Sequence, residues 1–271
     1  AWAFCTNISW PGRAEARTMS SAFADHFSPV ASAYADSRPD YPPALFDWLA
    51  SICAARDLAW DCGAGSGQAS IALASRFRRV IATDASAEQI VHATTHPNVE
   101  YRVAAAERSG LDPACADLVT VAQALHWFDL DRFWPEVRRV ARREALFAAW
   151  TYGPLHVEGA EADALIQRFR ADIAPWWPAE RRHVENDYRE LSFPFARLET
   201  PAFAIEVGWG VDRLLGYLRS WSSVVRFRQS QGVDPVQAIE TPLREAWGAQ
   251  DGQRAIRWPL TVLCGFVDSA A

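Results

Sequence analysis

The feature that most constrains the fold is a regular alternation of short apolar segments and helical segments between residues 58 and 150. The apolar segments are 58–63, 79–84, 99–104, 117–124 and 145–150. Helical patterns lie at 66–76, 87–94 and 129–143. Ser86, with Gln89 three residues later, can cap the helix at 87–94, and Asp129 or Asp131 can cap the helix at 129–143. Strands that alternate with helices in this way are joined by right-handed crossovers. The pattern therefore predicts an α/β fold with a mostly parallel sheet and helices on both faces.

The segments outside this core have a different rhythm. A helix is expected to begin at Pro43, a residue suited to the first helical turn, and further helices at 161–173, 211–225 and 235–248. The segments 203–209 and 258–267 predict two late strands that form an antiparallel edge of the sheet. We expect a single domain at 19–271, with an N-terminal helical cap (19–57), a core (58–150) and a C-terminal part with inserted cap helices (151–271). Residues 1–18, which precede Met19, are expected to be an extension that does not pack.

Net charge, hydropathy and cysteine spacing argue against several classes of binding partner. The 271 residues carry a formal net charge of −6, whereas nucleic-acid binders usually have a basic domain or stripe. No apolar run approaches the roughly 18 residues that a membrane span needs. The five cysteines show no C-x-x-C pair and no metal-ligand spacing, which indicates reduced thiols in a cytoplasmic protein. We expect no metal, no nucleic acid and no membrane as partner, and a monomer or homodimer.

The sequence DCGAGSG, at 61–67, lies between the first predicted strand and the first helix. Gly63, Gly65 and Gly67 allow a tight turn with positive φ and leave room for a ligand close to the backbone. The helix that follows offers free N–H groups in its first turn. Ligands of open α/β sheets bind at the carboxyl ends of the strands. The turn, which includes Ala64, therefore predicts a binding site for a nucleotide-like cofactor.

Acidic residues near the turn fit such a cofactor. Asp84 ends the second strand 21 residues after Gly63, where a carboxylate can accept hydrogen bonds from both ribose hydroxyls or, alternatively, cap the next helix. Asp61 lies within an apolar run and needs a partner, either a ligand ammonium or backbone N–H groups. Ala106 and Glu107 follow the third strand, where they either line an adenine pocket or form an exposed turn.

The spacing of the glycines distinguishes two cofactors. A dinucleotide fingerprint, G-x-G-x-x-G/A, requires Gly or Ala at position 68, whereas this chain has Gln68 and its third glycine at 67. An amino-acid tail next to a sulfonium instead favours a carboxylate at the start of the turn, which is the position of Asp61. S-adenosylmethionine is therefore favoured. A nicotinamide-dependent oxidoreductase and a non-catalytic cofactor-binding protein of the same fold are the alternatives.

Several segments together carry a resemblance to a known family. DCGAGSGQ (61–68), VIATDAS (80–86), AAAE (104–107) and DLVTVAQALHWFD (117–129) resemble a class I S-adenosylmethionine-dependent methyltransferase of the type 11 methyltransferase domain family. More narrowly, ALHWF, the W-x-Y-G at 150–153 and the Y-x-x-x-R-P-x-Y at 34–41 resemble its trans-aconitate-methyltransferase-like group. The resemblance covers about residues 23–267. It implies a Rossmann-like sheet of seven strands, the last of them antiparallel.

The resemblance also implies roles for individual residues. The glycines would hold the methionine part of the cofactor, with Asp61 near its amino group, Asp84 on the ribose and Ala106 or Glu107 beside the adenine. Gln123 and residues 124–127 would lie beside the sulfonium and the acceptor. The whole cofactor-binding set is Asp61, Gly63, Ala64, Gly65, Gly67, Asp84, Ala85, Ala106, Glu107 and Gln123. This chain departs from the family at 143–145, where Arg-Glu-Ala replaces the usual Pro-Gly-Gly turn, and we expect a reshaped loop there.

The acceptor is less constrained than the cofactor. His126 is expected to be a general base or a hydrogen-bond partner of the acceptor, the alternative being a structural histidine bonded to backbone. Gln123 is the second catalytic candidate. The substrate candidates are Tyr34, Arg38, Trp127, Trp150 and Arg226, since arginines can orient an anion by bidentate pairing. We expect methyl transfer to a small molecule, such as carboxyl O-methylation of an organic acid, with S-adenosylhomocysteine as the second product.

Overall fold

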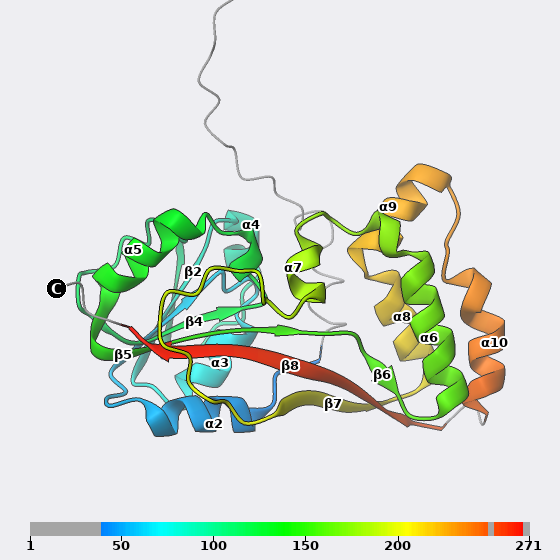
Figure 1. Cartoon of the computed structure of the whole chain (residues 1–271), viewed down its shortest axis with the longest axis horizontal. Helices are drawn as coiled ribbons and strands as arrows, with labels where there is room; N and C mark the ends of the chain where they lie inside the picture. Colours follow the sequence, from blue (N-terminus) through cyan, green and yellow to red (C-terminus); the bar gives the residue numbers. More distant parts are fainter. Residues whose placement is uncertain (1–38, 249–251, 268–271) are drawn as a thin grey trace, which may run out of the picture.

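The computed structural model describes residues 39–248 and 252–267 (Figure 1). The expected extension at 1–18 and two substrate candidates, Tyr34 and Arg38, lie outside these residues. The described chain contains a sheet of eight strands with helices packed against it, and a group of helices at one end of the sheet. None of the helices in these two ranges is both long and apolar enough to cross a membrane.

The first half of the chain builds the parallel part of the sheet, as the alternation of segments predicts. Strands β1, β2, β3 and β4 pair in the order β3-β2-β1-β4, all parallel, and β5 adds to β4 in the same direction. The elements of this half are α2 (Pro43–Ile52), β1 (Leu58–Cys62), α3 (Gln68–Ala74), β2 (Arg79–Asp84), α4 (Ala87–Val91), β3 (Val99–Val103), β4 (Ala116–Ala122), η2 (Leu125–Trp127), α5 (Leu130–Val140) and β5 (Ala141–Tyr152).

Helices cover both faces of this sheet because consecutive strand residues point to opposite sides. Leu118 and Leu146 pack with α2 and α3 on one face. Val119 and Phe147 pack with α5 on the other. In Figure 1, α2 and α3 lie below the sheet and α5 lies above it. The expected Rossmann-like architecture is therefore confirmed.

The second half of the chain adds the antiparallel edge. Strand β8 (Arg254–Phe266) pairs antiparallel with β5 on one side and with β7 (Phe203–Trp209) on the other. A two-residue strand, β6 (His156–Val157), pairs with β8 on the side of β5, beyond the end of the β5 pairing. The count is thus eight strands where seven were expected, because residues 153–155 interrupt the pairing along β8 and leave β6 as a separate segment.

A helical lobe surrounds the far ends of β7 and β8 (Figure 1, right). Its core contains Ile166, Leu214, Leu243 and Trp258, all fully or almost fully buried. The elements that build it are α6 (Ala160–Asp172), η3 (Ala174–Trp176), α8 (Val211–Arg219), α9 (Ser222–Gln231) and α10 (Gln237–Trp247). A short helix, α7 (Arg181–Glu185), lies between this lobe and the parallel half of the sheet.

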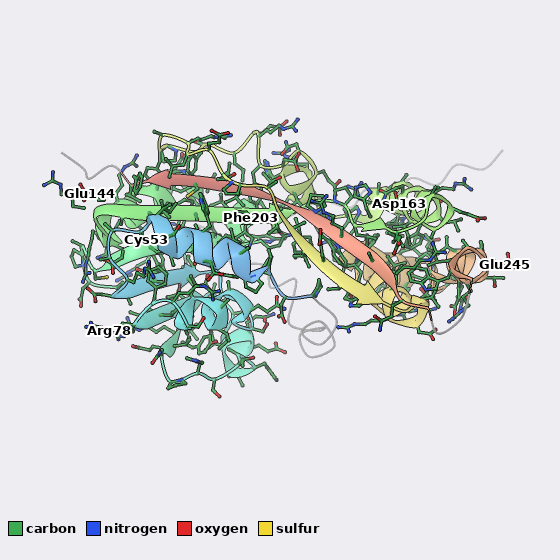
Figure 2. The ribbon with its side chains drawn as sticks, turned by 90° about the horizontal axis from the view of Figure 1, so that it is seen from below. Cys53, Arg78, Glu144, Asp163, Phe203 and Glu245 are labelled. Atoms are coloured by element: carbon green, nitrogen blue, oxygen red, sulfur yellow. The ribbon has the colours of Figure 1, made fainter. Side chains whose placement is uncertain are left out.

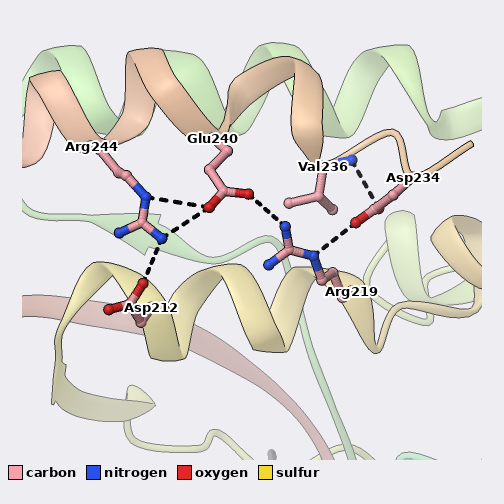
Figure 3. Close-up of polar contacts among 6 residues, drawn as sticks. All are labelled: Asp212, Arg219, Asp234, Val236, Glu240 and Arg244. Atoms are coloured by element: carbon pink, nitrogen blue, oxygen red, sulfur yellow. Dashed lines mark hydrogen bonds and ion pairs between the residues drawn. The ribbon is translucent and has the colours of Figure 1, made fainter.

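A chain of ion pairs ties α8 to α10 in this lobe (Figure 3). Arg219 on α8 contacts Asp234 at 2.8 Å and Glu240 at 2.6 Å. Arg244 on α10 contacts the same Glu240 at 2.9 Å and Asp212 at 2.6 Å. Because Glu240 is shared, the four ion pairs form one network, which contributes more reliably to stability than isolated surface pairs do.

Two helices differ from the sequence expectation in a way that tertiary contacts explain. The helix expected at 211–225 is divided into α8 and α9, because Trp221 leaves the helical conformation (φ −63°, ψ 134°) and its ring stacks on Phe169. The helix expected at 129–143 ends at Val140, and β5 begins at Ala141, opposite Ala116 of β4. The start of α2 at Pro43 and the cap of α4 at Ser86 agree with the expectation, whereas α3 and α4 are shorter than the expected 66–76 and 87–94.

The segment that replaces the family's Pro-Gly-Gly turn forms a bulge inside β5. The pairing of β4 and β5 shifts register between Ala116 and Leu118, and Glu144 takes a left-handed φ of +64°. Arg142, next to the bulge, donates to Asp117 at 2.8 Å. Figure 2 shows Glu144 at the end of the sheet farthest from the helical lobe. The segment at 143–145, which departs from the family pattern, therefore lies at the amino-terminal ends of the strands, away from the edge where ligands of such sheets bind.

Candidate functional site

The three glycines form a tight turn between β1 and α3. Gly63, Gly65 and Gly67 all have positive φ, at +69°, +55° and +89°. The N–H groups of Gly63 and Ala64 both donate to the carbonyl of Thr83 in β2, at 2.8 and 3.0 Å. Gly67 is the N-cap of α3 in the left-handed conformation. The turn therefore bends back across the end of the sheet, as the sequence predicts.

Two of these glycines also lie where a side chain would not fit. A Cβ added to Gly63 would lie 2.7 Å from Cβ of Ala124 and 3.0 Å from the Phe128 ring. A Cβ on Gly67 would overlap the hydroxyl of Tyr101 in β3. The turn is thus in close contact with the segment after β4 on one side and with β3 on the other, so these strand ends enclose one site.

Asp84, at the end of β2, lies against this turn. Its Oδ2 accepts a hydrogen bond from the N–H of Gly65 at 2.9 Å, and its Oδ1 accepts one from the N–H of Ser86 at 2.8 Å. The helix α4 is capped by Ser86, whose hydroxyl accepts from Gln89 N–H. The alternative in which Asp84 caps α4 is therefore wrong, and the half-buried carboxylate instead connects the glycine turn to the segment that contains Ala85.

Asp61 is fully buried directly beneath the turn. Its two carboxylate oxygens accept hydrogen bonds from Ser70 of α3 at 2.5 Å and from Thr120 of β4 at 2.8 Å. Burial raises the pKa of Asp61 to about 6, although both hydroxyls act in the opposite direction. A carboxylate kept in such surroundings despite the cost of desolvation is typical of a functional site.

Ala106 and Glu107 close the same edge of the sheet after β3. Ala106 is buried, and Glu107 is half-buried. The Glu107 carboxylate accepts a hydrogen bond from the N–H of Asp129, the N-cap of α5, at 2.9 Å. This contact joins the segment after β3 to the segment after β4, so both lie at the site of the glycine turn.

Gln123 follows β4 in a strained conformation, with a φ of +56°. Its N–H donates to the carbonyl of Trp150 at 2.8 Å, and its side-chain oxygen accepts from the N–H of Tyr152 at 3.1 Å. Strained backbone of this kind concentrates at functional sites. In this structure the side-chain oxygen of Gln123 holds the ends of β4 and β5 together.

His126 lies on η2, immediately after this turn. Its Nδ1 is 3.0 Å from the hydroxyl of Tyr188, and its ring centroid is 4.9 Å from that of Trp127. Burial, followed by the charges of Arg181 and His183, lowers the pKa of His126 to about 3. The imidazole is therefore neutral at physiological pH, and Trp127 forms a half-buried wall beside it.

The side chains of the two other described substrate candidates do not contact the glycine turn. Trp150 is fully buried among the aromatic rings of Tyr41 and Phe46, so core packing accounts for its position. Arg226 lies half-buried on α9 in the helical lobe, and no contact recorded for it in the described residues reaches the glycine turn.

A charged cleft of about 360 Å³ lies where α6 and α7 meet. Arg170 and Arg181 both pair with Glu185, and the Arg181 guanidinium stacks on the Trp177 ring, 4.4 Å from its centroid. Arg182 also lines the cleft. Three arginines and one carboxylate line the cleft, which gives it a positive potential, and its helix α7 contacts η2, where Arg181 lowers the pKa of His126.

Comparison with known proteins identifies the family to which the chain belongs. A family model described as a methyltransferase domain matches residues 60–149. A protein of Dictyostelium discoideum that is named as a methyltransferase is 32% identical over 234 residues, which cover 85% of this chain and 89% of the relative. The chain belongs to this methyltransferase family. The matched segment contains the glycine turn, Asp84, Glu107 and His126.

The fold of the methyltransferase is also similar to that of a solved structure. A structure described as a type II methyltransferase from Anaeromyxobacter dehalogenans has a TM-score of 0.81 and 50% identity, and the match covers 85% of this chain and 98% of that one. A relative from Saccharomyces cerevisiae, named as S-adenosylmethionine-dependent, is 29% identical over 44% of each chain. Because the chain belongs to this methyltransferase family, its cofactor is S-adenosylmethionine, the cofactor that the glycine spacing favours. The narrower resemblance to the trans-aconitate group stays a prediction.

Sequence reasoning missed Tyr188 and the α7 arginines of the methyltransferase. Tyr188 is 62 residues from His126, so no local pattern links them. The arginines were visible in the run ERRH at 180–183, one residue after PWWP, but their position relative to His126 depends on how α7 packs. In the described part of the chain, no group of three or more His, Cys, Asp or Glu side chains could hold a metal ion.

Proposed function

We propose that the glycine turn holds the methionine part of S-adenosylmethionine and that the strand ends around it hold the nucleoside. In this proposal the ammonium of the cofactor is neutralised by Asp61, the ribose hydroxyls are bound by Asp84, and the adenine lies beside Ala106 and Glu107. Two observations support this fit. A Cβ at Gly65 would have only the Gln89 side-chain oxygen within 4 Å among the described residues, at 3.8 Å, so the turn leaves space there, and the raised pKa of Asp61 indicates a carboxylate that a cation would stabilise.

When bound, S-adenosylmethionine supplies a methyl group attached to a sulfonium, which is an excellent leaving group. The protein therefore has to align the acceptor with this methyl group and exclude water, so proximity accounts for much of the rate. Residues 123–127 border the turn through Ala124 and would line the reacting centre. Gln123 would position this segment through its contact with Tyr152.

We propose that the acceptor is a small organic acid, methylated on a carboxylate oxygen. The observation that carries this proposal is the cleft with Arg170, Arg181 and Arg182, whose helix α7 contacts the segment that holds His126. Guanidinium groups bind carboxylates with paired hydrogen bonds. A carboxylate is already deprotonated at neutral pH and needs no general base, which agrees with the lowered pKa of His126.

The proposed contact of Asp61 predicts how cofactor affinity depends on pH. The free carboxyl has a pKa of about 6, and an ammonium beside it favours the charged form. Well below that pKa the protein must lose a proton to bind, so affinity is expected to fall about tenfold per pH unit, whereas it changes only about twofold between pH 6 and 7. Calorimetric titration with S-adenosylmethionine at several pH values between 4.5 and 7 measures the affinity at each pH.

Methylthioadenosine, which lacks the amino-acid tail, is the matched ligand control, and its affinity is expected to stay constant over the same pH range. The Asp61→Asn variant, which keeps the shape of the side chain, is expected to bind S-adenosylmethionine weakly and without the pH dependence. An affinity of the wild type that does not change below pH 6 would show that Asp61 does not contact the ammonium.

The chemistry of the product tests the proposed acceptor. We expect release of S-adenosylhomocysteine with one or more small carboxylic acids, and transfer of label from the methyl group into a product that mild base hydrolyses to methanol, because methyl esters are base-labile. The measurement is volatile label after base treatment, with a panel of phenols and amines as controls. Turnover that gives only base-stable products would overturn carboxyl methylation and leave methyl transfer intact.

A further inference from the structure

The hydrogen bond between His126 and Tyr188 defines the state of the imidazole. The distance between Nδ1 and the Tyr188 hydroxyl is 3.0 Å. Within the described residues, Nε2 of His126 has no hydrogen-bond partner, and the ring is only half-buried. One edge of the ring is therefore fixed by the protein, and the other is available to a ligand.

Tyr188 is held more rigidly than a loop residue usually is. Its side chain is fully buried in the core on the α5 face of the sheet. Asp187 and Tyr188 both have left-handed φ values, +57° and +59°, and such conformations persist only where the surroundings impose them. The N–H of Tyr188 donates to the carbonyl of His183 at 2.8 Å, and Asp187 accepts from Thr261 of β8 at 3.2 Å. The hydroxyl is thus fixed relative to the sheet.

The direction of the hydrogen bond follows from the cost of an unpaired buried donor. Burial raises the pKa of Tyr188, so its hydroxyl keeps its proton. Among the described residues, His126 is the partner found at hydrogen-bond distance from that hydroxyl, whereas the Thr151 hydroxyl lies near enough to lower the pKa of Tyr188 but has no hydrogen-bond partner. If Nδ1 were the donor, the buried O–H of Tyr188 would be left unpaired, which costs about 1–3 kcal/mol. The favoured arrangement has the tyrosine donating to Nδ1, so the neutral ring carries its proton on Nε2.

We propose that Tyr188 is a positioning residue that fixes His126 in the Nε2–H tautomer, so that His126 is a hydrogen-bond donor to the acceptor and not its general base. The part that concerns the acceptor rests on the proposed carboxylate methylation. A neutral N–H donor suits an acceptor that arrives as an anion, because it orients the carboxylate without neutralising it. Arg181 and His183 face the same ring and disfavour a second proton on it.

Nitrogen-15 NMR of the full chain labelled at histidine tests the tautomer without any need for activity. We expect His126 to show a pyridine-type Nδ1 and a pyrrole-type Nε2 from pH 6 to 8. Tyr188→Phe removes only the hydroxyl and is expected to shift His126 toward a mixture of tautomers. Tyr217→Phe, which removes a hydroxyl from a buried tyrosine in the helical lobe, is the control and is expected to leave the His126 signals unchanged. A protonated Nδ1 in the wild type, or an unchanged spectrum in Tyr188→Phe, would overturn the proposal.

Kinetics test the consequence for the acceptor. Tyr188→Phe is expected to lower kcat about tenfold and to leave the KM for S-adenosylmethionine unchanged. His126→Gln, which can place an N–H near the position of Nε2, is expected to retain more activity than His126→Asn, and Tyr188→Phe is expected to cost nothing further in the His126→Asn background. Equal loss in both His126 variants would overturn the donor role. If no carboxylic acid is methylated at all, the proposed acceptor fails, and the NMR result still decides the role of Tyr188.

Discussion

Replacing Gly63 by alanine is expected to weaken S-adenosylmethionine binding about a hundredfold. The added Cβ would lie 2.7 Å from Cβ of Ala124 and 3.0 Å from the Phe128 ring, and the residue would have to keep a φ of +69°. Both neighbours belong to the segment after β4, so relief of the clash moves the cofactor turn and the acceptor segment apart. To bind the cofactor, the variant has to restore the left-handed turn, which costs about 1–3 kcal/mol for a non-glycine residue. Each 1.4 kcal/mol of this cost lowers the affinity about tenfold. Calorimetric titration of the variant measures the loss.

Gly216→Ala is the matched control for this variant. Gly216 lies in α8, and a Cβ there would have no neighbour within 4 Å. Because alanine is a better helix former than glycine, this variant is expected to be at least as stable as the wild type and to bind S-adenosylmethionine equally well. Wild-type affinity in a folded Gly63→Ala variant would show that the turn does not form the cofactor site.

Replacing Asp84 by alanine is expected to have an effect of similar size. The change removes the acceptor for the N–H groups of Gly65 and Ser86, together with the proposed contact to the ribose. Hydrogen bonds to a charged group contribute about 1.5–3 kcal/mol each, so the affinity for S-adenosylmethionine is expected to fall about a hundredfold. Calorimetric titration is again the measurement, with Asp212→Ala in the helical lobe as the control for loss of a carboxylate.

Two nucleosides separate the ribose contact from the effect on the loop. Asp84→Ala is expected to weaken binding of adenosine more than binding of 2′,3′-dideoxyadenosine, because the dideoxy compound has no ribose hydroxyls to lose. An equal loss for both ligands would mean that Asp84 only shapes the glycine turn and the start of α4, and the ribose assignment would then be wrong.

The geometry of the proposed cofactor half of the site could be predicted from the sequence because its determinants are local. Positive φ at Gly63, Gly65 and Gly67 follows from a tight turn between a strand and a helix, and the position of Asp84 follows from the length of one crossover. The cap at Ser86 also depends only on neighbouring residues. Contacts between adjacent parallel strands then bring these segments to one edge of the sheet, as the alternation predicts.

The acceptor half depends on contacts that no local pattern encodes. Tyr188, the partner of His126, lies 62 residues away in the segment after α7. In the cofactor half the same holds for Ser70 and Thr120, the partners of Asp61, which come from different elements. Helix ends were also mispredicted where tertiary contacts decide them. Trp221 divides a continuous helical pattern because its ring packs into the lobe, and pairing with β4 converts the end of a predicted helix into β5.

The central claim, that the glycine turn is the S-adenosylmethionine site, is tested most directly by calorimetric titration of the full chain at pH 7. We predict saturable binding of S-adenosylmethionine and S-adenosylhomocysteine with one site per chain, no binding of a nicotinamide dinucleotide, and loss of the signal in Gly63→Ala while Gly216→Ala retains it. Absence of binding to the folded wild type, or equal binding by Gly63→Ala, would contradict the claim.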